Sequence, residues 1–264
     1  MTAAPTPRPG GARPSVPVTL DGTDVLAHEG ETILALARRV GVPIPTLCQL
    51  DGLSVYGGCR LCSVEVAGEH RLPLACATEV VPEMEVRTTS PTLANHRRRI
   101  VALLFAEGSH VCAACVASGA CELQDRASEN GVDHISYEMT FPRTPVDASH
   151  PKFILDRDRC VLCTRCVRVC DEIEGAHVWD IAQRGNQAHL IAGMDQPWGE
   201  VSSCTWCGKC VAVCPTGALA WQGTAPGELH ADPGLIAFLT DARDGTWDDR
   251  AGGNERRDDE EVAP

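Results

Sequence analysis

The sequence predicts an α+β protein built from three small modules, and three patterns carry this prediction. Short apolar runs with turn signals surround one amphipathic segment near the N-terminus, a Ser-Pro pair opens a long helical pattern at residue 90, and an eleven-residue cysteine motif occurs twice, 44 residues apart. We place a disordered lead-in at 1–15, the modules at 16–89, 90–150 and 151–225, and a C-terminal segment with an acidic disordered tail at 226–264.

The first module alternates strand and helix signals. Strand patterns at 16–20 and 24–28 flank an Asp-Gly turn and predict a hairpin. The stretch 31–40 has apolar residues at helical spacing and ends before a glycine. With further strand patterns at 63–66 and 80–88, this order of elements is typical of a β-grasp domain.

The second module begins with a helix. Ser90 is suited to the N-cap and Pro91 to the first helical position, and the helical pattern runs to Glu107. The basic run at 96–99 either steers an acidic partner or, as we favour, forms a solvated helix face. Residues 129–152 have little periodicity and predict a connecting loop.

Composition excludes several classes of protein. With 23 basic and 36 acidic residues the net charge is −13, which argues against a nucleic-acid or anionic-membrane binder. The most apolar run, 100–106, is far shorter than the roughly 20 residues of a transmembrane helix. Residues 1–15 do not resemble a secretion signal, so we expect a reducing cytoplasm, where closely spaced thiols among the 15 cysteines indicate metal ligands.

The cysteine repeat is the strongest signal. Residues 160–170 and 204–214 align without gaps and share six of eleven positions. Both read C-x2-C-x2-C-x3-C, the run of bacterial two-cluster ferredoxins, in which the fourth cysteine of each run ligates the other cluster. Asp171 in place of proline is the one departure, and a pair of zinc sites is the alternative that this spacing disfavours.

One loop supplies three converging thiolates, so the fourth must come from another direction. We therefore assign one 4Fe–4S cluster to a first-run set of Cys160, Cys163, Cys166 and Cys214. We assign another 4Fe–4S cluster to a second-run set of Cys204, Cys207, Cys210 and Cys170.

Four cysteines in the first module form an N-terminal set of Cys48, Cys59, Cys62 and Cys76. Their spacing lengthens the first gap of the plant-type 2Fe–2S pattern. Gly57 and Gly58 precede the central pair and allow the backbone to approach the sulfurs closely. We predict a 2Fe–2S site here, although spacing alone leaves a four-cysteine zinc site open.

The remaining cysteines are Cys112, Cys115 and Cys121, which are one ligand short. His110 stands two residues before Cys112, and its imidazole can take the fourth position. Spacing alone leaves open whether His110 is a ligand and whether this histidine set holds iron or zinc.

The three constellations in this order resemble the small diaphorase subunits of NAD-linked bidirectional nickel–iron hydrogenases and the related N-terminal iron–sulfur region of the large complex I subunit. Iron-only hydrogenases and NAD-dependent formate dehydrogenases carry a similar region. The matching motifs are HVCAAC at 110–115, CELQD at 121–125, RCVLCTRC at 159–166 and QPWGE at 196–200. Complex I places its histidine where this chain has Gly108, whereas the hydrogenase type places it like His110. The resemblance thus implies a 4Fe–4S cluster on His110, Cys112, Cys115 and Cys121.

The resemblance also implies a function. It indicates a subunit without catalytic residues of its own, in an NAD-linked oxidoreductase of the hydrogen dehydrogenase type. Its one 2Fe–2S and three 4Fe–4S clusters would relay electrons between a flavin- and NAD-binding diaphorase subunit and a small nickel–iron hydrogenase subunit. Fifty residues follow Cys214, and no dinucleotide fingerprint, flavin site or nickel-binding pair remains, so we expect the chain itself to bind no flavin, NAD or nickel.

Other functions stay open at this point. The same set of clusters would transfer electrons in an NAD-linked formate dehydrogenase or a split complex I-like assembly. A free-standing ferredoxin-type electron carrier is a further alternative. A multi-zinc structural protein is the alternative from a different class. Arg60, Arg165 and Lys209 stand between ligands and either stabilise reduced clusters or lie exposed on the surface.

Overall fold

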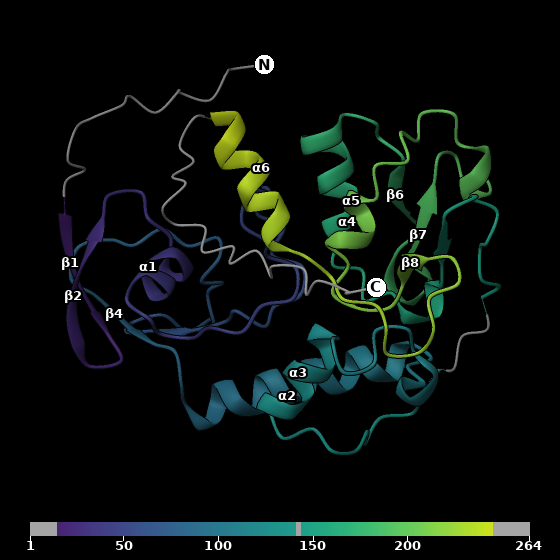
Figure 1. The fold of residues 1–264 in the computed structure, drawn as a ribbon. Helices are drawn as coiled ribbons and strands as arrows, with labels where there is room; N and C mark the ends of the chain where they lie inside the picture. Colours follow the sequence, from purple (N-terminus) through teal and green to yellow (C-terminus); the bar gives the residue numbers. More distant parts are fainter. Residues whose placement is uncertain (1–14, 141–143, 245–264) are drawn as a thin grey trace, which may run out of the picture.

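The computed structural model describes residues 15–140 and 144–244 (Figure 1). Its N-terminal part contains a four-stranded mixed sheet. The sheet has the order β2-β1-β4-β3, formed by β1 (Ser15–Leu20), β2 (Thr23–His28), β3 (Glu65–Val66) and β4 (Met84–Arg87). Strand β1 pairs antiparallel with β2 and parallel with β4, and the buried face of helix α1 (Ile33–Arg39) packs on the sheet. The predicted hairpin, helix and later strands are therefore present.

Two side chains explain the ends of these elements. Asp21 adopts φ 49° in the hairpin turn, and its carboxylate accepts hydrogen bonds from the Thr88 backbone N–H (2.7 Å) and hydroxyl (2.5 Å). Thr32 caps α1 by accepting a hydrogen bond from the Ala35 N–H at 3.2 Å. The turn is thus tied to the end of β4, and the helix begins where its cap is placed.

The second module consists of helix α2 (Pro91–Glu107) and helix α3 (Glu122–Glu129), which pack against each other below the rest of the chain in Figure 1. The Ser90 hydroxyl accepts a hydrogen bond from the Leu93 N–H at 3.1 Å, so the predicted helix start is confirmed. The predicted solvated basic face is wrong for Arg97. That side chain is buried and donates to the Leu61 and Ser63 carbonyls (3.2 and 3.0 Å), which docks α2 on the first module.

Two small antiparallel pairs organise the third module, β5 (Phe153–Leu155) with β8 (Leu219–Trp221) and β6 (Trp179–Ala182) with β7 (His189–Ala192). The two cysteine runs lead into the short helices α4 (Arg165–Arg168) and α5 (Lys209–Ala212), which contact each other. A π-helical turn, Val169–Glu174, continues α4. The repeat in the sequence is therefore a repeat in the fold.

Helix α6 (Gly234–Asp244) was not predicted, and it extends into the stretch expected to be disordered. Ile236 of α6 is fully buried, and the Thr240 hydroxyl reaches the Gly52 carbonyl at 3.4 Å, so packing on the first module stabilises the helix. The rest of the predicted tail, 245–264, and the lead-in through residue 14 lie outside the described residues. Within the described ranges no helix is long and apolar enough to cross a membrane.

Candidate iron–sulfur centres

The N-terminal set lies in loops beside the sheet. The Sγ atoms of Cys62 and Cys76 are 3.3 Å apart, and the Ala75 N–H donates to the Cys62 carbonyl at 3.0 Å, which holds the two loops together. Cys48 and Cys59 interact as a pair, and their charges act on Cys76. The structure therefore brings all four predicted ligands of this set together.

Electrostatics within this set favour one thiolate. A hydrogen bond from the Cys59 thiol lowers the pKa of Cys48 to about 6, and the same bond raises the pKa of Cys59. The nearby Arg168 guanidinium also lowers the pKa of Cys48. Thiolates are the form that binds iron, so the lowered pKa of Cys48 favours metal binding by this residue.

The two glycines before the central pair each have a local steric reason. Gly57 adopts φ +70°, and a Cβ at Gly58 would fall 2.1 Å from the Tyr56 ring. A larger residue at Gly58 would therefore displace that ring.

The histidine set surrounds a hollow of about 310 Å³, which is lined by all four predicted ligands His110, Cys112, Cys115 and Cys121. The His110 Nε2 atom is buried and has no hydrogen-bond partner among the described residues. Burial lowers the pKa of His110, which favours the neutral imidazole that binds metals. An orphaned ring nitrogen beside three thiols fits a metal cluster, and burial raises the pKa of the Cys121 thiol to about 11.

Gly108 explains why the histidine stands at position 110. A Cβ at Gly108 would lie 2.5 Å from His110 Nε2 and 2.7 Å from the Asp158 carbonyl oxygen. The imidazole of His110 therefore occupies the space that a side chain at 108 would need. A side chain at position 108 is therefore incompatible with the observed position of the His110 ring.

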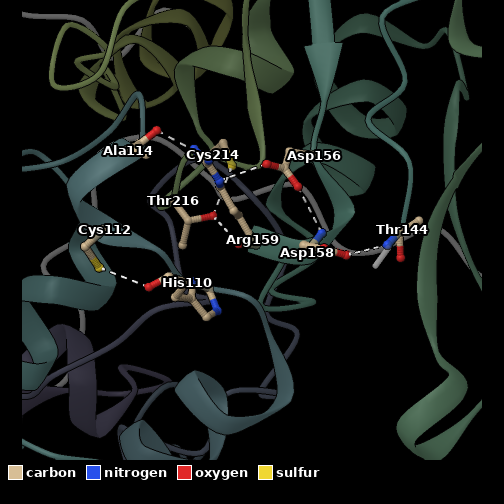
Figure 2. A network of polar contacts seen from close by, with 9 residues as sticks. All are labelled: His110, Cys112, Ala114, Thr144, Asp156, Asp158, Arg159, Cys214 and Thr216. Carbon is tan, nitrogen blue, oxygen red and sulfur yellow. Dashed lines mark hydrogen bonds and ion pairs between the residues drawn. The ribbon is translucent and has the colours of Figure 1, made fainter. Parts of the chain in front are cut away.

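A polar network joins the histidine set to the first-run set (Figure 2). The Arg159 side chain pairs with Asp156 at 2.8 Å and reaches the Ala114 carbonyl at 3.5 Å, while its own carbonyl accepts from the Thr216 hydroxyl at 2.8 Å. That hydroxyl lies 3.8 Å from the Cys214 sulfur. Thr216 lines both hollows, so the two sites are neighbours.

The first-run set surrounds a second hollow, of about 350 Å³, lined by Cys160, Cys163, Cys166 and Cys214. Its other walls include the aliphatic side chains of Ile181, Leu190 and Leu219. Burial raises the pKa of Cys160 and Cys163 to about 12. The fourth member, Cys214, comes from the other run, as the crossed assignment requires.

The second-run set surrounds a third hollow, of about 320 Å³, lined by Cys170, Cys204, Cys207 and Cys210. The walls here include the aromatic rings of Phe153, Trp179 and Trp198. The Val178 N–H donates to the Cys170 sulfur at 3.4 Å, and burial raises the pKa of the Cys210 thiol. Cys207 is the one exposed cysteine among the described residues, so this site is near the surface.

Two buried arginines of α4 tie the modules together. The Arg168 guanidinium donates to the carbonyls of Cys48 and Ser54, both at 2.5 Å, and reaches the Cys163 carbonyl at 3.4 Å. Arg165 pairs with Glu122 of α3 at 2.5 Å and donates to the Gln49 carbonyl at 3.2 Å. The first-run set therefore lies between the other three.

Of the two alternatives left open for Arg165, surface exposure is excluded, because the residue is 2% exposed. Arg60 is exposed, and Lys209 is half-buried in an ion pair with Glu174. Sequence reasoning missed Arg168 and also His150, a fully buried histidine whose Nε2 lies 3.8 Å from the Cys204 sulfur. Burial lowers the pKa of His150. No spacing motif contains His150, but the Gln-Pro-Trp-Gly-Glu motif packs around it.

The donor chemistry suits clusters. Within 15–140 and 144–244 no group of three or more His, Cys, Asp or Glu side chains converges closely enough to hold a lone metal ion. Three of the sets line hollows, and each supplies four soft or borderline donors, as iron–sulfur clusters require.

Three sequence families match consecutive parts of the chain. Residues 13–91 match the 2Fe-2S iron-sulfur cluster binding domain, residues 97–136 the NADH-ubiquinone oxidoreductase-G iron-sulfur binding region, and residues 151–220 the ferredoxin-like domain of NADH-quinone oxidoreductase subunit 3. The chain therefore has a 2Fe–2S domain followed by 4Fe–4S domains.

Individual relatives narrow the family. The NAD-reducing hydrogenase HoxS subunit gamma of Cupriavidus necator is 34% identical over 206 residues, which cover 78% of this chain and 86% of the relative. The chain belongs to the HoxS gamma family. One chain of a solved NAD+-reducing NiFe-hydrogenase in the H2-reduced state is 34% identical, with a TM-score of 0.75. The match covers 80% of the present HoxS gamma family member and 88% of the hydrogenase chain. The resemblance predicted from the cysteine motifs is confirmed.

Other relatives are much longer proteins. The NADP-reducing hydrogenase subunit HndD of Solidesulfovibrio fructosivorans is 38% identical over 238 residues and 85% of this chain, yet the chain spans only 40% of that relative. It spans 24% of the NADPH-Fe(3+) oxidoreductase subunit alpha of Geobacter sulfurreducens. The matched region is thus one part of those larger chains.

Proposed function

We propose that this chain is an electron-transfer subunit of an NAD-linked hydrogenase. One 2Fe–2S and three 4Fe–4S clusters would relay electrons between a flavin- and NAD(H)-binding diaphorase subunit and a nickel–iron hydrogenase module. The observation that carries the proposal is that three separate hollows are each lined by one complete four-ligand set, including both crossed cysteines. A family relative matched over 86% of its length supports it.

The ligand roles follow the four sets. The 2Fe–2S cluster would be held by Cys48, Cys59, Cys62 and Cys76. The 4Fe–4S clusters would be held by His110, Cys112, Cys115 and Cys121, by Cys160, Cys163, Cys166 and Cys214, and by Cys204, Cys207, Cys210 and Cys170. When bound, such clusters supply one-electron redox chemistry.

The chain itself would set the surroundings of each site. Burial of the first-run thiols keeps water away, and the Arg165 guanidinium lowers the pKa of Cys163 against the larger effect of burial, so it favours negative charge there. Exposure of Cys207 brings the second-run site within reach of a partner surface. The hollows of the histidine set and the first-run set share Thr216, and adjoining buried sites with access at one end are what a relay needs.

Iron and acid-labile sulfide analysis of the anaerobically purified full chain tests the cluster content. We expect about 14 iron atoms per chain from one two-iron and three four-iron clusters. A colourless preparation that holds zinc instead would overturn the proposal in favour of a structural zinc protein.

The His110 assignment has its own test. The variant His110→Ala should change the EPR spectrum of one 4Fe–4S cluster only, because one ligand is lost. His134→Ala is the matched control, since His134 is exposed and pairs only with its neighbour Asp133. An unchanged spectrum in His110→Ala would remove His110 from the ligand list.

Partner identity is tested by anaerobic co-purification from the native host, followed by identification of the subunits. A flavoprotein and a nickel–iron hydrogenase subunit are the expected partners. Recovery of a molybdenum formate dehydrogenase or complex I-like subunits instead would keep the relay and replace the hydrogenase. A monomer without any partner would favour a free carrier.

A further inference from the structure

A buried histidine outside the ligand sets touches the second-run site. His150 is 1% exposed, and its Nε2 atom lies 3.8 Å from the sulfur of Cys204. The ring stacks on Phe153 with centroids 4.7 Å apart and meets Trp198 at 4.8 Å. Such packing restrains the plane of the imidazole, and Nε2 is the ring nitrogen on the side of the cysteine.

The protonation of the ring follows from its other nitrogen. The Lys152 backbone N–H donates to His150 Nδ1 at 3.1 Å, so Nδ1 is an acceptor and carries no proton. In the neutral ring the proton is then on Nε2. His150 is therefore positioned to donate an N–H···S hydrogen bond to Cys204.

Two indoles extend this donor shell around the same hollow. The Trp179 indole lies close enough to Cys210 to lower the pKa of its thiol against the larger effect of burial. Trp198 also lines the hollow, and its buried Nε1–H has no partner among the described residues. An indole N–H can only donate, and the four cysteine sulfurs are among the acceptors that line this hollow.

The Gln-Pro-Trp-Gly-Glu segment holds the shell in place. The Asp147 carboxylate accepts from the backbone N–H groups of Trp198 at 2.8 Å and Ser149 at 2.9 Å, and the Gly199 backbone N–H donates to the Ser149 hydroxyl at 2.8 Å. A Cβ at Gly199 would lie 2.3 Å from the Ser149 carbonyl oxygen. The backbone segment that leads to His150 is therefore held against the segment that carries Trp198.

We propose that His150, with Trp179 and Trp198, raises the reduction potential of the cluster held by the second-run set through N–H···S hydrogen bonds. This inference rests on the proposed function. Reduction adds one electron and no proton, so negative charge on the sulfurs grows while each N–H stays on its ring. Hydrogen bonds to the sulfurs stabilise that added charge and are one of the means by which proteins set cluster potentials.

The experiment is an EPR-monitored redox titration of the full chain purified without air. The signal of this cluster is first identified as the one that Cys207→Ser removes. His150→Phe keeps an aromatic ring and removes the donor, and we expect the equilibrium constant for reduction to fall about tenfold, or about 59 mV for a one-electron couple. His150→Gln retains an N–H donor and should keep a midpoint closer to the wild type.

Trp221→Phe is the matched control, because Trp221 packs on Phe153 but does not line the hollow. Its midpoint should not move. If His150→Phe loses iron, Trp198→Phe decides: a lower midpoint supports the donor shell, and an unchanged midpoint overturns it.

The two ways to fail are distinct. A clear cluster signal whose midpoint is the same in wild type and His150→Phe overturns this inference and leaves the proposed function intact. A wild-type chain without iron or sulfide overturns the proposed function first.

Discussion

The two cysteine runs of the third module have similar backbone conformations but are surrounded by different side chains. Leu162 and Trp206 occupy the same position of the repeat and have φ of 50° and 63°. Two positions later, Thr164 and Gly208 have φ of 59° and 75°. The cysteine spacing thus produces one loop conformation twice, with three sulfurs converging in each copy.

Their surroundings diverge. The first copy places Arg165 and Arg168 on its helix, buried at 2% and 8% exposure, where the second copy has Lys209 and Ala212. The first-run hollow has aliphatic walls, while the second is lined by Trp179 and Trp198. The first-run site therefore has buried arginines beside it and the second-run site has indole side chains, although both candidate ligand sets consist of four cysteines.

The difference follows from position in the molecule. The first copy lies at the centre, where its arginines satisfy carbonyls of the first module and a carboxylate of the second. The second copy lies at the edge, with Cys207 exposed. A duplicated motif thus gives two sites of different character because each copy meets different neighbours.

The largest effect expected is loss of a cluster from the opposite copy. Cys214→Ser should remove about four iron atoms from the site of the first run, and Cys170→Ser the same number from the site of the second. Iron analysis with EPR distinguishes the two signals. If each variant damages the site of its own run instead, the crossed ligation is wrong and the comparison needs new ligand sets.

Arg168→Met tests the central position of the first copy. The buried carbonyl of Cys48 and the carbonyl of Ser54 would lose their donor, and we expect a destabilisation of up to about 3 kcal/mol. Anaerobic denaturation followed by cluster absorbance measures it. Arg38→Met, at an exposed ion pair with Asp51, is the control and should cost less than about 0.5 kcal/mol. Equal costs for the two variants would contradict the role of Arg168.

Gly217→Ala tests whether the end of the second run serves a different site. A Cβ at Gly217 would lie 2.7 Å from the Cys115 sulfur and 3.1 Å from a Val116 methyl. We expect a cost of about 1–3 kcal/mol and a changed EPR signal from the histidine set. Gly234→Ala, where a Cβ meets nothing closer than 3.6 Å, is the control. A change confined to the second-run signal would contradict this reading of the fold.

The smallest effect concerns the shared loop conformation. Gly208→Ala keeps ordinary contacts, since the nearest atoms lie 3.4 Å from a Cβ, so the cost should be the left-handed backbone alone, about 1 kcal/mol. Thermal denaturation of the full chain measures it. A cost well above this would mean that the second loop, unlike the first with Thr164, does not tolerate a side chain.

Much of the candidate site could be predicted because it is local. A helix cap such as Ser90 and a ligand run such as 160–170 act through neighbours in the chain, so their spacing is sufficient. The buried Arg97 and helix α6 could not be predicted, since both depend on packing against the first module. From sequence alone, a basic run and a polar tail are expected to be solvent-exposed, because the segments that cover them are distant in the chain.

The sequence by itself predicted the four candidate ligand sets, because the spacing of the cysteines limits how many sulfurs of one loop can point to a common centre. Only the tertiary structure decided what surrounds each set. His150 reaches Cys204 across 54 residues, and Arg168 reaches the Cys48 carbonyl across 120. Contacts over such separations depend on how the modules pack, and a spacing motif contains no information about them.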